Sequence, residues 1–223
     1  MTVHATSTGI LIFARAPISG QCKTRLIPAL GQDGATAIHA AMIRHTLTTA
    51  HQAGVGPVEL WCTPTPQHPF FVTGLSQQPP FTRHRQQGQD LGARMAHAIE
   101  HALQRYSRVI LIGTDCPTLD ENHLRQAQHL LVTGCDAVIG PAQDGGYVLI
   151  ALSRTDPALF QGINWGTNTV LQQTRHCLSR LHYHWQELAE LSDIDTADDL
   201  YTLINADGAV ALGTCCIPLK QSD

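Results

Sequence analysis

The sequence predicts one α/β domain built on a mainly parallel β-sheet with helices on both faces. Continuous apolar runs at residues 9–14 and 108–113 have the length of strands that are buried on both faces. Segments of strand character alternate with helical segments at the spacing of βαβ units. The chain has 223 residues, of which 43% are apolar, so a single domain with a sizeable core accounts for its length.

Turn residues separate these segments in the first half of the chain. Gly54 and Gly56 end a helix whose apolar side chains recur on one face. The stretch after the next strand is rich in Pro, Gln and Thr, which predicts a long surface excursion. The predicted order is strand 9–14, helix 33–53, strand 58–62, excursion 63–80, strand 81–85 and helix 90–106.

The second half continues the alternation. Asp120 is expected to cap the helix that follows the central strand, and Thr196 to cap the last helix. Little pattern remains after residue 207, so the domain is predicted to span residues 1–206 and to be followed by a C-terminal tail, 207–223. The predicted order is strand 108–113, helix 120–132, strands 136–140 and 147–151, helix 167–180, strand 181–185 and helix 197–205.

The composition excludes two classes of partner. A net charge of -4 with only 14% charged residues leaves no basic surface for general nucleic-acid binding. The longest apolar run is too short to span a bilayer, and the first residues lack the cationic start of a signal peptide. The cysteines include no CxxC pair and are expected to be reduced thiols. We therefore expect a cytoplasmic protein with no membrane and no nucleic-acid partner.

Arg15, Lys23 and Arg25 lie together in the connection after the first strand. The chain has 12 Arg and only two Lys, and the second lysine, Lys220, lies in the tail. Gly20 allows a tight backbone here, and such a loop can offer N–H groups and guanidinium donors to phosphate oxygens. The loop matches neither Walker A nor GxGxxG, which disfavours a dinucleotide-dependent oxidoreductase. The alternative is a solvated loop with incidental cations.

Aspartates stand at three places where ligands of a parallel sheet are expected. Asp115 follows the central strand, where a carboxylate suits Mg²⁺ or Mn²⁺. Asp195 precedes the last helix, outside the first turn that Asp198 and Asp199 occupy, and is the candidate for a second metal-facing carboxylate. Asp144 lies in a glycine-rich turn, for which an ordinary Asp-Gly hairpin is the alternative.

Six motifs occur in one order along the chain: FARAPxxGxxKTRL (13–26), QxGxDLGxRM (86–95), IGTDCPxL (112–119), GPAxDGGY (140–147), FxGIxW (160–165) and DIDTxxDL (193–200). With them the chain resembles the radical-SAM/selenodomain-associated transferases, also described as arsenosugar-biosynthesis glycosyltransferases, over residues 9–205. That family belongs to the nucleotide-diphospho-sugar transferase superfamily. The resemblance therefore implies a GT-A-type, Rossmann-like three-layer α/β/α sandwich. The superfamily also contains nucleotidyltransferases that activate phospholactate, molybdopterin and KDO.

The resemblance implies roles for two segments that would bind a nucleotide. The three loop cations resemble the phosphate-contacting loop of the nucleotidyltransferases, with Lys23 and Arg25 also acting in catalysis. Gln86, Gly92 and Arg94 lie in a segment that resembles the base- and ribose-contacting segment of those enzymes.

The resemblance also implies a divalent cation, Mg²⁺ or Mn²⁺, held by two carboxylates. Asp115 resembles the metal-binding Asp of the GT-A fold and would contact the nucleotide through the metal. Asp195 matches the carboxylate before the Thr of DTxxDL, which is the second metal position in KDO-activating relatives. Asp144 is a plausible base for an acceptor hydroxyl. Two features depart from the pattern: Cys116 and Pro117 follow Asp115 in place of a standard DxD, and the first loop lacks GGxGxR.

The expected function is a metal-dependent glycosyltransferase that moves a sugar from a nucleotide sugar to a small-molecule acceptor. The alternative is a nucleotidyltransferase that joins an NTP to a phosphorylated small molecule and releases pyrophosphate, which the cationic loop itself favours. A non-catalytic nucleotide-sugar-binding module is a third reading, disfavoured because all three aspartates are present. The expected partners are a nucleotide or nucleotide sugar and the acceptor, and a homodimer is compatible with the sequence.

Overall fold

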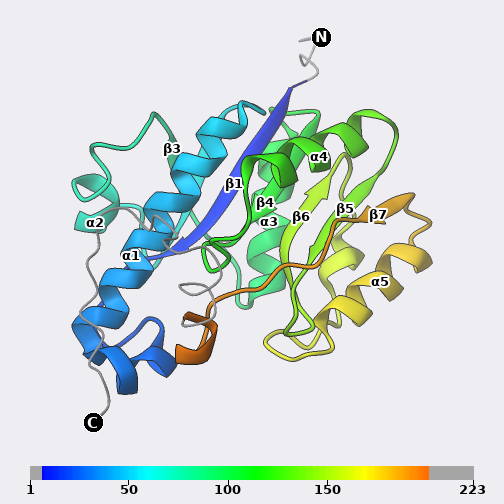
Figure 1. Ribbon diagram of the computed structural model, residues 1–223. Coiled ribbons are helices and arrows are strands. Elements are labelled where there is room, and N and C mark those ends of the chain that lie inside the picture. The colour runs from blue at the N-terminus through cyan, green and yellow to red at the C-terminus, as the bar shows by residue number, and fades with distance from the viewer. Residues whose placement is uncertain (1–6, 201–223) are drawn as a thin grey trace.

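The computed structural model describes residues 7–200, in which seven strands form one sheet (Figure 1). The sheet order is β3-β2-β1-β4-β6-β5-β7. The ends of the predicted domain, the predicted tail 207–223 and the last helix beyond residue 200 lie outside the described residues. The strands are β1 Thr8–Arg15, β2 Val58–Thr63, β3 Thr82–Arg85, β4 Arg108–Ile112, β5 Ala137–Pro141, β6 Tyr147–Leu152 and β7 Trp185–Glu187.

Strand direction confirms the mainly parallel sheet. β1 pairs in parallel with β2 and β4, and β2 pairs in parallel with β3. β6 pairs antiparallel with both β4 and β5, so β5 points the same way as β4, and β7 follows β5 in parallel. In the described sheet β6 is thus the one reversed strand. The carboxyl ends of the others meet at one edge, where α/β sheets bind ligands.

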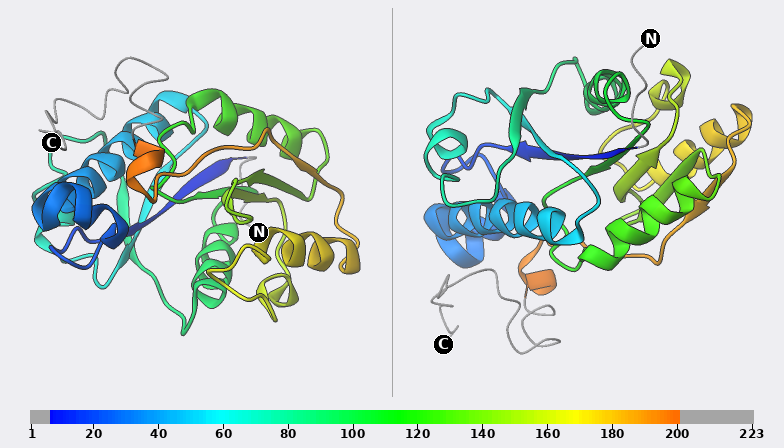
Figure 2. Two further views of the ribbon diagram at one scale, coloured as in Figure 1. Left: turned by 60° about the horizontal axis from the view of Figure 1, so that its bottom comes forward. Right: turned by 90° about the horizontal axis from the view of Figure 1, so that it is seen from above.

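Helices cover both faces of the sheet and make three layers (Figure 2). β1 shows the principle: Ile10 and Ile12 pack into a core cluster beneath α1 and α4, whereas Leu11 packs into a second cluster beneath α3 and α5. Full burial of each such side chain stabilises the fold by about 1.5–3 kcal/mol. The helices are α1 Ile27–Ala53, α2 Pro69–Val72, α3 Leu91–Leu103, α4 Glu121–Val132 and α5 Val170–Arg180, with 3-10 turns at Thr24–Leu26 and Pro157–Phe160.

The structure confirms the two helix caps that the sequence predicts, at Asp120 and Thr196. The carboxylate of Asp120 accepts from the backbone N–H groups of Asn122 and His123, which caps α4. Thr196 and Asp199 exchange side-chain and backbone hydrogen bonds at the helix that begins at residue 197.

Two predicted boundaries are wrong and one predicted loop contains a helix, each for a local reason. α1 begins at residue 27 and continues past Gly31, whose φ of 73° interrupts it, so the expected start at 33 misses its first turn. The excursion 63–80 contains the short helix α2. The predicted strand 181–185 starts too early: α5 ends at Arg180, a turn follows in which His182 adopts a φ of 52° and Tyr183 N–H bonds back to Leu178, and β7 begins only at Trp185. The alternating aromatic pattern there covers the turn and only the first residue of the strand.

Candidate functional site

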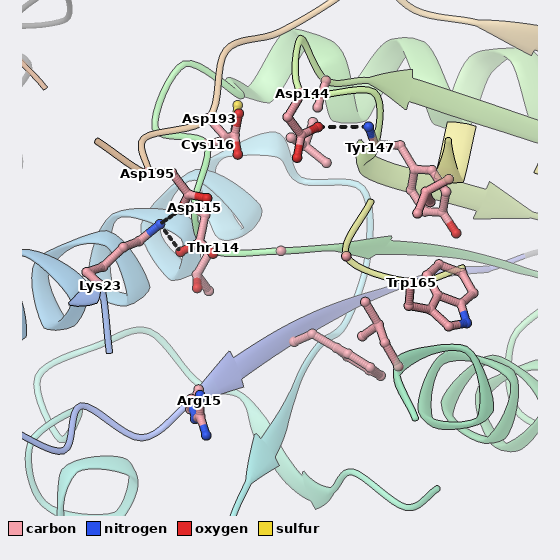
Figure 3. A pocket seen from close by; sticks show the side chains of 18 of the residues that line it. Arg15, Lys23, Thr114, Asp115, Cys116, Asp144, Tyr147, Trp165, Asp193 and Asp195 are labelled. Carbon is pink, nitrogen blue, oxygen red and sulfur yellow. Dashed lines mark hydrogen bonds and ion pairs between the residues drawn. The ribbon is translucent and has the colours of Figure 1, made fainter. Parts of the chain in front are cut away.

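A cavity of about 830 Å³ opens at the carboxyl ends of the strands (Figure 3). It is bordered by the loop after β1, the loop after β4, the turn between β5 and β6, the segment before α5 and the segment around 193–195. Seven of the predicted site residues line it: Arg15, Lys23, Arg25, Gln86, Asp115, Asp144 and Asp195.

Asp115 and Asp195 lie in the same part of this cavity, as the sequence predicts for a shared ligand. The segment that carries Asp195 passes along the loop after β4, where Ile194 N–H donates to the carbonyl of Asp115 at 2.9 Å. A parallel bridge between Ala142 and Leu191 leads the segment there. Both carboxylates are about half exposed toward the cavity, with 49% and 45% of each side chain accessible. They can therefore bind a ligand from solvent.

Lys23 occupies the space between the two carboxylates. Its Nζ lies 3.1 Å from Asp115 Oδ1 and 2.9 Å from Asp195 Oδ1, and also donates to the carbonyl of Ile194. Only 4% of the lysine side chain is exposed. Burial by itself would lower the pKa of Lys23, but the charges of Asp115 and Asp195 outweigh it and leave the pKa raised. The ammonium is thus the counter-ion of the pair, and the lysine lies at the edge of the cavity with almost all of its side chain covered.

The two arginines of the loop lie on the cavity rim. Arg25 is 73% exposed and its Nη1 is 3.6 Å from Asp195 Oδ2, a loose contact. Arg15 ends β1 with an exposed side chain, and its carbonyl accepts from Nε2 of the buried His39 at 2.9 Å. Burial lowers the pKa of His39. The guanidinium groups are therefore the loop cations that a bound phosphate can reach.

Asp144 and Asp193 add negative charge opposite the lysine. Asp144 Oδ1 accepts from Gly146 N–H at 2.8 Å, so the carboxylate is fixed on its turn. Burial and the charge of Asp144 raise the pKa of Asp193. The sequence alone assigns no role to Asp193, although it lies in the same motif as Asp195. Four carboxylates now converge on the charged half of the cavity.

Aromatic and apolar side chains form the other half of the cavity. The rings of Tyr147 and Trp165 meet edge to face with centroids 6.5 Å apart, and Phe13 and Met95 line the same wall. Burial raises the pKa of the Tyr147 phenol. Tyr147 and Trp165 stand in the sequence motifs, but nothing in the sequence alone brings them together.

Gly92 and Arg94 do not line the cavity, and their predicted nucleotide contacts stay predictions. A Cβ on Gly92 would lie 2.5 Å from Nε1 of Trp165, so the glycine lets the indole pack against α3. Arg94 Nε donates to the carbonyl of Gly88 at 3.1 Å and fixes the loop before α3. Gln86 lines the cavity but uses its amide Nε2 to bind the carbonyl of Trp61 at 2.8 Å. These three residues shape the wall.

The donor set fits a divalent cation that arrives with a phosphate ligand. Among residues 7–200 no three His, Cys, Asp or Glu side chains are grouped closely enough to hold a metal by themselves. Asp115 and Asp195 already converge on one cation, the ammonium of Lys23. Mg²⁺ is commonly held by one or two carboxylates together with substrate phosphates and water. Two carboxylates together with phosphate and water oxygens would complete such a site.

Solved structures similar to this chain include proteins named as transferases. A protein of Desulfovibrio desulfuricans G20, provisionally named a nucleotide-diphospho-sugar transferase, is 31% identical, with 92% of this chain and 90% of that chain covered and a TM-score of 0.82. CMP:2-keto-3-deoxy-manno-octonic acid synthetase in complex with CTP is 10% identical, with 88% and 96% covered and a TM-score of 0.53. At 10% identity it shows the fold alone.

Rv0371c of Mycobacterium tuberculosis H37Rv, solved in complex with manganese, is 16% identical, with 91% of this chain and 100% of that chain covered and a TM-score of 0.51. No curated protein matches the sequence. Among residues 7–200 no helix is long and apolar enough to cross a membrane.

A family model covers the centre of the chain, residues 46–167, and includes the loop of Asp115 and the turn of Asp144. The fold agrees with the nucleotide-diphospho-sugar transferases in its mixed sheet flanked by helices. The chain therefore belongs to the family described as "Uncharacterized protein conserved in bacteria (DUF2064)".

Proposed function

We propose that the protein is a metal-dependent transferase that binds a nucleotide or nucleotide sugar in the cavity and passes a sugar to a small-molecule acceptor. The observation that carries this proposal is the pair Asp115 and Asp195, which share one cation at the carboxyl ends of the parallel strands. The 31% identity to a protein named as a nucleotide-diphospho-sugar transferase supports the substrate class.

In this proposal the charged half of the cavity binds the diphosphate. Asp115 and Asp195 would hold Mg²⁺ or Mn²⁺, which would supply neutralisation of the negative charge on the departing nucleoside diphosphate. Arg15 and Arg25, on the rim, would donate forked hydrogen bonds to the phosphate oxygens. The predicted catalytic role of Lys23 would require its ammonium to leave the carboxylates.

Asp144 is the proposed base for the acceptor. The acceptor hydroxyl gives its proton to Asp144, and its oxygen forms a bond to the anomeric carbon as the bond from that carbon to phosphate breaks. Gly146 N–H binds Oδ1 of Asp144, which leaves Oδ2 to receive the proton. The aromatic wall with Tyr147 and Trp165 excludes water from the bond that breaks.

Nucleotidyl transfer is the second candidate, because the cationic loop after β1 is the part of the site that most resembles nucleotidyltransferases. The fold shared with a synthetase that binds CTP supports it. In that reaction an oxygen of the acceptor phosphate attacks the α-phosphorus of an NTP, and pyrophosphate leaves. Asp144 is then not required as a base, since a phosphate nucleophile carries no proton that must be removed.

The two reactions differ in the product that is released. The test incubates the protein with a panel of NTPs and nucleotide sugars in Mn²⁺ with small acceptors and separates nucleoside diphosphate from pyrophosphate. Glycosyl transfer releases diphosphate and is slowed by Asp144→Asn, whereas nucleotidyl transfer releases pyrophosphate and tolerates that change. Binding of a nucleotide without release of either product supports a non-catalytic module and contradicts both reactions.

Four finer expectations are part of the same proposal. They are the association with radical-SAM proteins and arsenosugar biosynthesis, the cytoplasmic location, the homodimer and the absence of nucleic-acid partners. The acceptor that receives the sugar tests the link to arsenosugar biosynthesis, and cell fractionation tests the location. Sedimentation tests the homodimer, and a binding assay tests the absence of nucleic-acid partners.

A further inference from the structure

The ammonium of Lys23 is enclosed by protein oxygens: it donates hydrogen bonds to Asp195 and to the carbonyl of Ile194, and it forms an ion pair with Asp115, whose Oδ1 accepts no hydrogen bond. A lysine ammonium carries three N–H groups and no acceptor. Three oxygens surround Nζ: Asp195 Oδ1 at 2.9 Å, Asp115 Oδ1 at 3.1 Å and the carbonyl of Ile194. With 4% of the side chain exposed, no phosphate in the cavity reaches it in this arrangement.

The backbone holds Lys23 in this place at a conformational cost. Its φ of 46° and ψ of 45° lie in the left-handed region, which residues other than glycine rarely adopt. Strain of this kind persists only where surrounding contacts determine it, and it is common at ligand sites and switches. Here the contacts come from the segment 172 positions later in the sequence. The contacts of the ammonium with Asp115 and Asp195 therefore offset the conformational cost of the left-handed backbone at Lys23.

The ammonium and a divalent ion cannot occupy the carboxylate pair together, because both would lie within about 4 Å and repel each other strongly. We propose that Lys23 is a built-in counter-ion that competes with the metal for Asp115 and Asp195, so that the metal binds together with a phosphate-bearing ligand. The phosphates supply the displaced ammonium with new anionic partners. This second part rests on the proposed function, whereas the competition between lysine and metal does not.

The direct test is the binding of Mn²⁺ alone, measured by calorimetry without nucleotide. Lys23→Met removes the competing charge and is expected to bind Mn²⁺ at least about tenfold more tightly than the wild type, because two facing carboxylates lose their counter-ion. The matched control is Arg25→Met, which removes a cation that is 73% exposed and 3.6 Å from the same Asp195. Its affinity for Mn²⁺ is expected to stay within about threefold of the wild type, since exposed charges interact weakly.

Equal affinity of Lys23→Met and the wild type for Mn²⁺ would overturn the proposal. So would an equal gain in Lys23→Met and Arg25→Met, because that is the effect of net charge alone. The double variant Lys23→Met with Asp115→Asn is expected to lose the gain, which ties it to the carboxylate pair. If no nucleotide binds, the proposed function is contradicted. The comparison of Mn²⁺ affinities still tests the competition between lysine and metal, because it is made without nucleotide.

A second measurement keeps the proposal falsifiable if Lys23→Met does not fold. Lys23 and Lys220 are the only lysines, so protein labelled with ¹³C at the lysine Cε gives two side-chain signals, assigned with Lys220→Arg. The Lys23 signal is expected to shift when Mg²⁺ and a nucleoside diphosphate are added together, or when Mg²⁺ alone reaches saturation. An unchanged Lys23 signal while Mg²⁺ binds would show that the ammonium is not displaced.

Discussion

Gly92 at the start of α3 lies against the indole of Trp165, so closely that a Cβ would stand 2.5 Å from Nε1. The two residues come from distant parts of the sequence, and Trp165 lines the cavity while Gly92 does not. The glycine therefore determines where the aromatic wall stands. It acts on the site through a neighbour, without contact to a ligand.

Gly92→Ala is expected to displace Trp165, because there is no room for both groups. The expected results are a red shift of tryptophan fluorescence, a loss of about 1–3 kcal/mol of stability through overpacking and weaker nucleotide binding. The control for overpacking is Gly113→Ala, where an added Cβ meets no atom within 4 Å; because Gly113 lines the cavity, it is compared with Gly92→Ala in stability and fluorescence and not in nucleotide affinity. If Gly92→Ala keeps the fluorescence and the nucleotide affinity of the wild type, Trp165 does not form the binding wall.

Asp115→Asn is expected to weaken nucleoside diphosphate binding in Mn²⁺ by about tenfold or more, since the metal loses one of two charged ligands. In EDTA the variant and the wild type are expected to bind equally weakly. Calorimetry in both conditions checks this, with Asp156→Asn as a matched substitution at a 3-10 turn outside the cavity. Equal affinity of the wild type with Mn²⁺ and with EDTA would contradict the metal assignment.

Arg25→Ala is expected to weaken nucleoside diphosphate binding by about tenfold or more, because a charge-assisted hydrogen bond contributes about 1.5–3 kcal/mol. The side chain is 73% exposed, so the free energy of unfolding should change by less than about 0.5 kcal/mol. Titration with the free nucleoside is the control, since it has no phosphate to lose. A similar loss for nucleoside and diphosphate would exclude a phosphate contact.

Lys23→Ala is expected to differ from Arg25→Ala in its effect on the fold. It removes a buried cation and leaves Asp115 and Asp195 facing each other, although both are about half exposed. Solvent screening limits the cost to about 1 kcal/mol in the free energy of unfolding. Chemical denaturation of the two variants checks the difference. Equal stability of both would mean that the ion pairs of Lys23 do not stabilise the fold.

The buried His39 is expected to make the protein less stable in mild acid. Burial lowers its pKa below the ordinary 6.5, so between the two values the unfolded chain binds a proton that the folded chain does not bind. This stability is complete above about pH 6.5 and is lost as the pH falls toward the folded pKa. Between about pH 7.5 and about pH 5.5 the melting temperature of His39→Gln should therefore fall by less than that of the wild type.

The control for His39→Gln is His129→Gln, an exposed position on α4. It is expected to keep the pH dependence of the wild type. If His39→Gln also keeps it, another group accounts for the acid sensitivity.

Short-range signals made most of the fold predictable. The apolar runs of β1 and β4 and the cap at Asp120 depend on neighbours in sequence, and the structure confirms them. The strand expected at 181–185 begins only at Trp185, because the turn at His182 depends on how α5 ends and not on the alternation of side chains.

The candidate site was predictable in its members more than in its arrangement. The rarity of lysine drew attention to Lys23, and the resemblance named both carboxylates. Neither indicates that the lysine is buried, because its burial depends on Ile194 and Asp195, far along the chain. The packing of Gly92 on Trp165 could not be predicted either, because the two residues are also far apart in the sequence.

The reversed strand β6 makes the turn of Asp144 the closed end of a β-hairpin. β5 ends and β6 begins at this edge, and Ala142 N–H bonds to Gly146 while Gly145 N–H bonds back to Ala142. A carboxylate on such a closed hairpin cannot travel with a lid. The start of α5 is held by the same turn, because Leu171 N–H donates to the carbonyl of Gly145 at 2.9 Å. Acceptors of different size must then be accommodated at a border that this turn does not hold, such as the loop after β1, and we expect relatives with other acceptors to differ there in length.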